Sequence, residues 1–411
     1  MKVLLVGQAY GPGLGSEPGL TWNWAWHLSA HHRVWVLAHP KWRTEVEDAL
    51  AATPNPNLCV IWVTLPPHID PWDPRQGERW IRLHYLLWQR AAFREASRLH
   101  RRIGFDLVHH VSWNTLSAPP LLWRLPIPFV WGPVGGGQLA PVAFRRYFGR
   151  NWRLQAVRNA RIRLLPRLPM LRRAVRNSAL LLATNPETAR VMDMAGARDV
   201  RFLYDNGLSA ESLPASPPGR ASSPEVTLLW AGRLEARKAL PLLLEAMAQT
   251  QDLEPPPRLL VAGDGPLRAE WETMAGQLGL GDRVRFLGLV PWRQMPMLYR
   301  DADAFVFTSL QDSSGSAVFE AMAFALPVLT LNHQGMAALL PADVGVKVPV
   351  TTPAETVARL ADGIRQLARS PDDRRSMGKA AWSCANAQSW VRRAELMTGW
   401  YREVVDAYRH H

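Results

Sequence analysis

Two cations follow the first strand expected in the second half of the chain. Residues 226–232 (VTLLWAG) form an apolar run that predicts a buried strand, and Arg233 and Lys238 come shortly after it. A guanidinium binds phosphate through two parallel hydrogen bonds, and an ammonium adds a compact positive charge. The pair therefore suits a diphosphate. Taken alone, an arginine and a lysine at a strand end are more typical of solvated surface.

Two carboxylates, Asp312 and Glu320, stand eight residues apart around a Ser-Ser-Gly-Ser turn that precedes an expected helix. Backbone N–H groups around Gly315, Ser316 and Ala317 would project from the start of that helix, where its dipole favours phosphate or sugar oxygens. Four residues of helix separate Glu320 from Ser316 by about 6 Å, so the two carboxylates could reach different parts of one extended ligand. Taken alone, the motif is more typical of an Asp312 that caps the helix and an exposed Glu320.

Alternating strands and helices must position these residues. Residues 3–7 predict a buried strand, a glycine-rich loop runs to Gly19, and a helix and a second strand follow; the alternation restarts at residue 226. Such alternation is typical of parallel sheets covered on both faces, whose ligands bind beyond the carboxyl ends of the strands. We therefore expect an α/β fold with two Rossmann-like domains facing across a cleft.

Composition shifts suggest the domain boundaries. Residues 1–208 are expected to form the first domain, the proline- and serine-rich stretch 209–224 a linker, and residues 225–388 the second domain. The amphipathic end of the chain, about 389–411, is expected to pack back on the first domain.

Charge is concentrated in one segment. The chain has 411 residues and a net charge of +13, and residues 145–176 hold eleven arginines and no acid. Their mixture with apolar side chains is typical of a surface that meets anionic lipid, through residues such as Arg153, Arg161 and Arg172. A solvated helix in an arginine-rich protein is an equally open interpretation. Nucleic acid is disfavoured, since no recognition motif occurs.

Other features bound the class of protein. Apolar residues make up 47%, which is typical of a globular chain, and only two cysteines occur. No export signal or membrane-spanning run is evident, so we expect a cytoplasmic protein that could lie on the inner face of a membrane.

Several segments taken in order carry a specific resemblance. Residues 232–248, 259–268, 283–290 and 312–320 resemble the C-terminal half of retaining glycosyltransferases of family 4, which have the GT-B fold. Residues 15–26 resemble the first glycine-rich loop of that family, and 105–110 its strand that ends in a histidine.

The resemblance implies roles for the residues of the second half. Arg233 and Lys238 would bind the donor diphosphate, and Glu320 the ribose hydroxyls. Asp312 stands where the family has the first glutamate of its E-x7-E pair, beside the donor sugar, and is one methylene shorter. Further donor contacts are implied at Gly263, Leu287, Gly315, Ser316 and Ala317.

The resemblance also implies contacts from the first half. His109 would reach the transferred sugar, with neighbouring His110 as an alternative. Gly15 and Ser16 would lie under the diphosphate. Acceptor contacts are expected at Glu17 and at Gly136, where a triple glycine is either an approach for the acceptor or a flexible turn.

The implied reaction is sugar transfer from a UDP- or GDP-sugar with retention of configuration. No nucleophilic carboxylate is clearly placed on the opposite face, which favours a same-face displacement with electrostatic help from Arg233 and Lys238. No carboxylate cage is evident, so we expect no metal and no cofactor. The acceptor is expected to be lipid-linked or a polysaccharide precursor; a soluble acceptor, or a basic binding protein without catalysis, are the alternatives.

Overall fold

The computed structural model describes residues 1–14, 16–73, 77, 79–209, 213–219, 225–313 and 315–410. The chain so described divides into two compact units. Unit 1 comprises Met1–Gly137, Ile162–Gly207 and Trp390–His411, and unit 2 comprises Gln138–Arg161 and Leu208–Ser389.

Within its described residues, unit 1 holds a seven-stranded parallel sheet in the order β3-β2-β1-β4-β5-β6-β7. Its strands are β1 (Lys2–Val6), β2 (Arg33–Ala38), β3 (Leu58–Trp62), β4 (Leu107–His110), β5 (Phe129–Val134), β6 (Leu180–Ala183) and β7 (Val200–Phe202). Its helices include α1 (Ser16–Leu28), α2 (Arg43–Ala52), α3 (Ile81–Ile103), α6 (Pro169–Arg176), α7 (Pro186–Ala195) and α15 (Trp390–Arg409). The strand order reverses between β1 and β4, the place where doubly wound sheets bind ligands.

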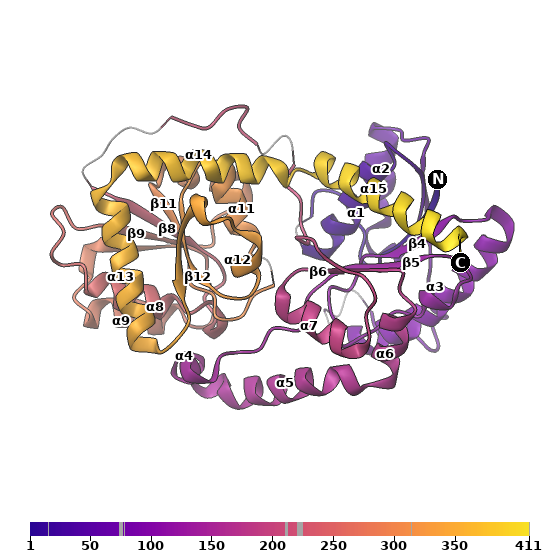
Figure 1. The fold of residues 1–411 in the computed structure, drawn as a ribbon, viewed down its shortest axis with the longest axis horizontal. Coiled ribbons are helices and arrows are strands. Elements are labelled where there is room, and N and C mark those ends of the chain that lie inside the picture. The colour runs from indigo at the N-terminus through magenta and orange to yellow at the C-terminus, as the bar shows by residue number, and fades with distance from the viewer. Residues whose placement is uncertain are drawn as a thin grey trace. The chain divides into compact units, whose positions relative to one another are not determined.

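Unit 2 repeats this plan with a six-stranded sheet, counted over its described residues, in the order β10-β9-β8-β11-β12-β13 (Figure 1). Its strands are β8 (Thr227–Ala231), β9 (Arg258–Ala262), β10 (Val284–Gly288), β11 (Ala304–Phe307), β12 (Val328–Asn332) and β13 (Gly345–Pro349). The helices are α8 (Leu240–Ala248), α9 (Arg268–Gln277), α10 (Met295–Asp301), α11 (Ser316–Ala323), α12 (Gln334–Leu339), α13 (Pro353–Arg369) and α14 (Pro371–Ala387). The expected fold of two Rossmann-like domains is thus confirmed.

The last helix, α15, belongs to unit 1 and lies beside α1 (Figure 1). Trp390 at its start meets Trp24 edge to face, with ring centroids 5.2 Å apart. Met397 and Tyr401 lie fully buried in the same core. The apolar face of α15 therefore completes the first domain, as the sequence led us to expect.

One segment departs from the expected boundary. Residues 138–161 lie inside the predicted first domain, 1–208, yet group with unit 2. This segment contains α4 (Arg145–Phe148) and most of α5 (Trp152–Leu164), and its Phe144 and Phe148 are buried in the core of unit 2. Burying two phenylalanines outweighs sequence proximity, because each buried aromatic side chain contributes roughly 1.5–3 kcal/mol.

The expected linker, 209–224, is described only at 209 and 213–219. Within the described residues, every helix is too short or too polar to cross a bilayer.

Candidate functional site

Four residues expected to bind a donor line one cavity in unit 2. The cavity has a volume of about 420 Å³, and Arg233, Gly263, Ala317 and Glu320 contribute to its wall. The remaining lining residues come from strand ends and from α10: Ala231, Gly232, Ala262, Asp264, Leu289, Val290, Met295 and Tyr299. The cavity therefore forms where the carboxyl ends of β8, β9 and β10 meet the start of α11, as parallel sheets favour.

Gly263 allows two of these strand ends to approach closely. Its φ is 138°, and a Cβ placed there would lie 1.9 Å from the carbonyl oxygen of Gly232. Its N–H instead donates to the carbonyl of Gly288 at 2.8 Å. A side chain at position 263 would push apart the backbone that forms the cavity wall.

Arg233 presents a cation to the cavity. Its side chain is exposed, and among the described residues it pairs with no carboxylate. The turn that carries it is fixed by two backbone hydrogen bonds, from Leu234 N–H to Asp264 (2.9 Å) and from Glu235 N–H to the Arg233 carbonyl (2.8 Å). A positioned, unneutralised guanidinium can accept an anionic ligand through two parallel hydrogen bonds.

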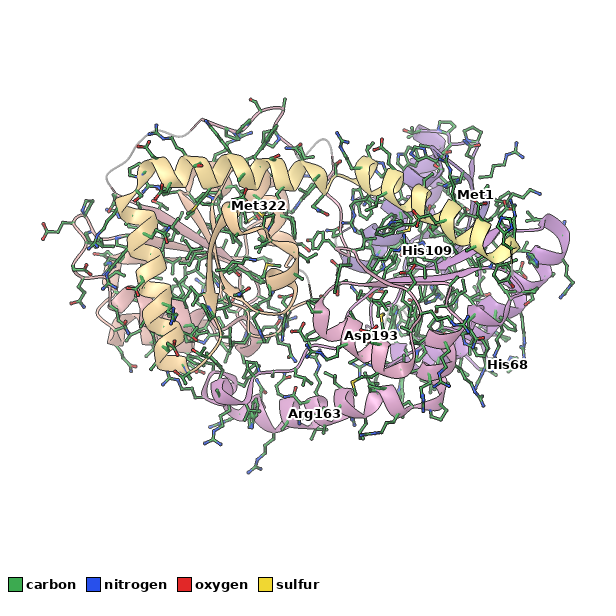
Figure 2. The ribbon with its side chains drawn as sticks, in the orientation of Figure 1. Met1, His68, His109, Arg163, Asp193 and Met322 are labelled. Atoms are coloured by element: carbon green, nitrogen blue, oxygen red, sulfur yellow. The ribbon has the colours of Figure 1, made fainter. Side chains whose placement is uncertain are left out.

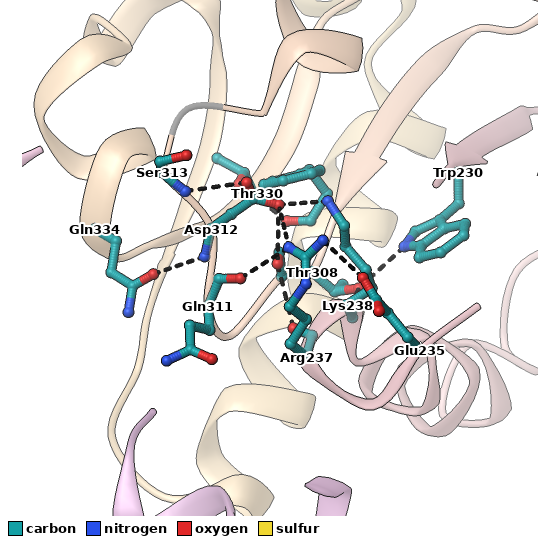
Figure 3. A network of polar contacts seen from close by, with 12 residues as sticks. Trp230, Glu235, Arg237, Lys238, Thr308, Gln311, Asp312, Ser313, Thr330 and Gln334 are labelled. Carbon is teal, nitrogen blue, oxygen red and sulfur yellow. Dashed lines mark hydrogen bonds and ion pairs between the residues drawn. The ribbon is translucent and has the colours of Figure 1, made fainter. Parts of the chain in front are cut away.

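Lys238 is instead engaged with Asp312. Its ammonium donates to Asp312 Oδ2, and both side chains are largely buried, with 14% and 18% of their surface exposed (Figure 3). Burial alone would raise the pKa of Asp312, but the positive charges of Lys238 and Arg237 outweigh burial and hold that pKa below its usual value. Asp312 is therefore an ionised carboxylate.

Arg237 was not singled out from the sequence, yet it joins two carboxylates. Its guanidinium contacts Glu235 Oε1 at 2.6 Å and Asp312 Oδ2 at 3.2 Å, and it donates to the carbonyl of Gln311 at 3.1 Å (Figure 3). The signal available was the run Glu-Ala-Arg-Lys at 235–238, but its partner lies 75 residues away.

Gln334 was also missed, and it ties three segments together. Its Oε1 accepts from Asp312 N–H at 2.9 Å, while its Nε2 donates to the carbonyls of Leu139 (3.0 Å) and Leu310 (3.4 Å). Gln334 is 3% exposed and has a φ of 51°. A left-handed conformation at a residue other than glycine persists when its surroundings over-determine it, and these hydrogen bonds do so.

The expected helix start is present at α11. Gly315 precedes it with a φ of 64°, and its carbonyl accepts from Val318 N–H at 2.9 Å. The first N–H groups of a helix have no intrahelical acceptor, so those of Ser316 and Ala317 can serve a ligand. Gly315 packs against Phe307, which a Cβ at that position would meet at 3.0 Å.

Glu320 lies one turn further along α11 and lines the same cavity. Tyr299 donates its hydroxyl to Glu320 Oε2 at 3.0 Å. Burial raises the pKa of Glu320 and the Tyr299 hydrogen bond opposes that rise. Leu287 is not among the lining residues; it lies half-buried in β10, and the nearby Leu289 and Val290 line the cavity instead.

His109 lies inside unit 1 rather than at an open surface (Figure 2). Its Nε2 donates to the carbonyl of Gly132 at 2.7 Å, and its Nδ1 accepts from the hydroxyl of Tyr401 at 2.5 Å. Burial lowers the pKa of His109 to about 4. Both ring nitrogens are thus occupied within the domain, which differs from the sugar contact that the sequence suggested.

The alternative, His110, is buried as well. Its Nε2 lies 2.8 Å from the hydroxyl oxygen of Tyr85, and burial lowers its pKa to about 3. Its Nδ1 has no hydrogen-bond partner among the described residues, but it is buried within unit 1.

Glu17 belongs to a polar cluster at the carboxyl edge of the sheet of unit 1. Its Oε1 accepts from Asn114 N–H at 2.9 Å, and Asn114 Nδ2 donates to Asp205 at 2.7 Å. Burial raises the pKa of Glu17 to about 7. The N–H of Gly135 donates to Asn114 Oδ1. The next residue, Gly136, has a φ of 98°.

Other expected residues lie elsewhere. Gly15 falls outside the described residues, and Ser16 is the first residue of α1. Arg153 and Arg161 are exposed on α5, and Arg172 is exposed on α6. Arg163 also lies on α5 (Figure 2).

Part of the chain is similar in sequence to known proteins. Residues 216–383 match the family model described as glycosyl transferases group 1. An alpha-D-kanosaminyltransferase of Streptomyces kanamyceticus is 27% identical over 43% of this chain and 45% of its own length. A D-inositol 3-phosphate glycosyltransferase of Saccharomonospora viridis is 31% identical over 45% of this chain and 44% of its own. The aligned parts thus span less than half of these two relatives.

Solved structures match over the whole chain. Sucrose-phosphate synthase from Thermosynechococcus elongatus has a TM-score of 0.64 at 19% identity, with 99% of each chain covered. HepE from Anabaena, solved in complex with UDP, has a TM-score of 0.62 at 19% identity, covering 98% of this chain and all of that one. At such identities the likeness shows the fold: two Rossmann-like domains of the GT-B type.

The Asp312 ion pair predicts a pH-dependent stability. A carboxylate whose folded-state pKa is depressed contributes stability above its unfolded pKa of about 4 and loses it as the pH falls through the lower folded pKa. We expect Asp312→Asn to lower the free energy of unfolding by about 3 kcal/mol at pH 7. Its stability should also change less than that of the wild type as the pH falls below about 4.

Urea unfolding followed by circular dichroism across this pH range measures both effects. Asp301→Asn, at an exposed aspartate of α10, is the matched control. Equal pH profiles for Asp312→Asn and the wild type would contradict an ionised, paired Asp312.

Proposed function

We propose that this chain is a retaining glycosyltransferase of family 4 that transfers a sugar from a nucleotide diphosphate donor. The observation that carries the proposal is the cavity of unit 2, which joins a guanidinium that pairs with no carboxylate in the described part of the chain, a glycine-lined strand end, a helix start and a half-buried carboxylate. Relatives named as glycosyltransferases and the match of residues 216–383 support it. Related folds solved with UDP and with UDP-glucose support a UDP-sugar as the donor.

The cavity residues, together with Lys238 from the loop after β8, suit the parts of such a donor. Arg233 would bind the diphosphate, and the N–H groups at the start of α11 would receive phosphate or sugar oxygens. Lys238 has three N–H donors and gives one to Asp312 in the described structure, which leaves donors for a phosphate oxygen. Glu320 would accept from ribose hydroxyls, oriented by Tyr299.

The same arrangement supports a retaining reaction that needs no metal ion. Negative charge grows on the departing diphosphate, and positioned cations and N–H groups stabilise it without reorganisation. Arg233 and Lys238 would supply the positive charge that a divalent metal provides in other phosphate sites. The acceptor hydroxyl would then attack from the face that the diphosphate leaves.

The arginine-rich segment favours a lipid-linked or polysaccharide-precursor acceptor at the inner membrane face. Leu154, Leu164 and Met170 expose at least half of their surface beside the arginines of α5 and α6. Apolar side chains can enter the boundary of a bilayer while arginines bind anionic headgroups, which is typical of proteins that lie on membranes.

The two donor cations provide the direct test. We expect Arg233→Ala and Lys238→Ala each to lower kcat/KM for sugar transfer by about 10²–10³, because each removes charge stabilisation from the departing diphosphate. Both variants should also lose the rise in Tm that UDP gives the wild type. Arg293→Ala, at an exposed arginine of unit 2, should behave as wild type. A wild type that shows no stabilisation by any nucleotide diphosphate would contradict the proposal.

Gln334 should act on the reaction by positioning Asp312. Gln334→Gly removes the side chain but tolerates the positive φ, so we expect Tm to stay within a few degrees while kcat/KM falls roughly tenfold, the loss of about one hydrogen bond. Gln334→Ala should be less stable than Gln334→Gly, because alanine retains the backbone strain. Full activity in Gln334→Gly would show that Asp312 needs no such support.

Membrane binding is tested on the arginine-rich segment. The triple variant Arg153→Glu, Arg161→Glu and Arg172→Glu should lose at least about 3 kcal/mol of binding to anionic vesicles, more than a hundredfold, at about 1 kcal/mol per basic residue. Co-sedimentation with vesicles measures this loss, and neutral vesicles should bind neither protein. The control reverses three exposed arginines elsewhere: Arg90, Arg285 and Arg293. Equal sedimentation of both triple variants would favour a soluble acceptor.

A further inference from the structure

A cluster of metal-ligating side chains lies in unit 1, among residues that sugar transfer does not use. His39 directly follows β2, Asp70 lies in the segment after β3, and His84 is in the first turn of α3. One ligand atom from each of the three residues lies within 4.8 Å of the other two. The fold thus gathers three potential ligands from segments spread over 46 residues.

The two histidines are withdrawn from solvent. His84 is fully buried and His39 is 7% exposed. Among the described residues, no hydrogen-bond partner reaches His84 Nε2. A buried polar atom without a partner lowers stability by about 1–3 kcal/mol, so the unpartnered Nε2 of His84 is a reason to look for a ligand at this place.

Neighbouring groups hold the cluster in place. Asp70 Oδ1 lies 2.6 Å from His84 Nδ1 and also accepts from Trp72 N–H at 3.0 Å. The ring centroid of Trp72 lies 4.8 Å from that of His84 and 5.2 Å from that of His39. A carboxylate bonded to one nitrogen of a histidine fixes its proton there and leaves the other nitrogen as a ligand, the pattern common around protein-bound metals.

We propose that His39, Asp70 and His84 form a binding site for one divalent transition-metal ion, with zinc as the probe. The two imidazoles would bind the ion, Asp70 would orient His84 through its Nδ1, and water would complete a four-coordinate shell. Bonds of about 2.0–2.1 Å place two ligand nitrogens about 3.3 Å apart, and the centroids of the two imidazole rings lie 5.0 Å apart in the structure. On binding, His39 gives up the 3.2 Å contact that its Nδ1 accepts from Lys41 N–H, or turns its other nitrogen to the ion.

The positive charge of Lys41 lies close to this cluster and allows a second test of zinc binding. Its ammonium lies over the rings of Trp42 (4.5 Å) and Trp72 (5.3 Å), the second of which borders the cluster. A positive charge at this distance opposes a cation, so Lys41→Met should raise the affinity for zinc. A purely structural histidine network predicts no such gain.

The test uses the full chain without an affinity tag. After equilibrium dialysis against zinc, elemental analysis should find about one zinc per wild-type chain, and zinc should raise Tm in a way that a chelator reverses. His39→Gln, His84→Gln and Asp70→Asn should each weaken binding at least tenfold in competition with a chromogenic chelator. His68→Gln, at an exposed histidine of the same unit, should bind as the wild type does (Figure 2).

Two results would overturn the site. One is a wild type that takes up no stoichiometric zinc and gains no thermal stability from it. The other is zinc binding that survives all three substitutions, which would place the ion elsewhere, for example at the C-terminal histidines 410 and 411. Because the wild-type measurements need no variant, a variant that fails to fold leaves the test intact, and neither result depends on sugar transfer.

Discussion

The charge of Asp312 is the constraint on which the site of unit 2 depends. A largely buried carboxylate must be compensated, and Lys238 and Arg237 compensate it from the loop after β8. That requirement holds the loop after β8 against the loop after β11, which carries Asp312. Gln334, at the start of α12 after β12, binds the backbone of Asp312 and so joins a third segment to these two. Three strand ends are thereby held together by polar contacts in addition to the apolar core of unit 2.

Residues at the ends of strands and helices could be predicted from the sequence, and the reason is geometric. Arg233, Gly263, Ala317 and Glu320 share one cavity because parallel strands deliver their carboxyl ends to one edge. The local sequence pattern was sufficient to predict these four residues. It was insufficient for Gln334, whose left-handed backbone and three hydrogen bonds arise from segments up to 195 residues away.

His109 shows the opposite failure. A histidine at a strand end suggests a ligand contact, but its ring turns inward and is satisfied by Tyr401, 292 residues later. Side-chain direction near the end of a strand depends on what covers the sheet, and the ring of His109 meets Tyr401 of α15 here. Segment 138–161 was misassigned for a related reason, since the burial of Phe144 and Phe148 in unit 2 is decided by tertiary packing.

The charges beside the cavity explain why an aspartate can stand at position 312. Its shorter side chain is already engaged with Lys238 and Arg237, so Asp312 serves here to hold cations in place. Glu235 and Asp312 together balance Arg237 and Lys238. Arg158 adds another positive charge close enough to Arg237 that, with burial, its pKa is lowered. An anionic ligand of the cavity would meet the guanidinium of Arg233, which pairs with no carboxylate of the described residues, alongside the carboxylates of Asp264 and Glu320.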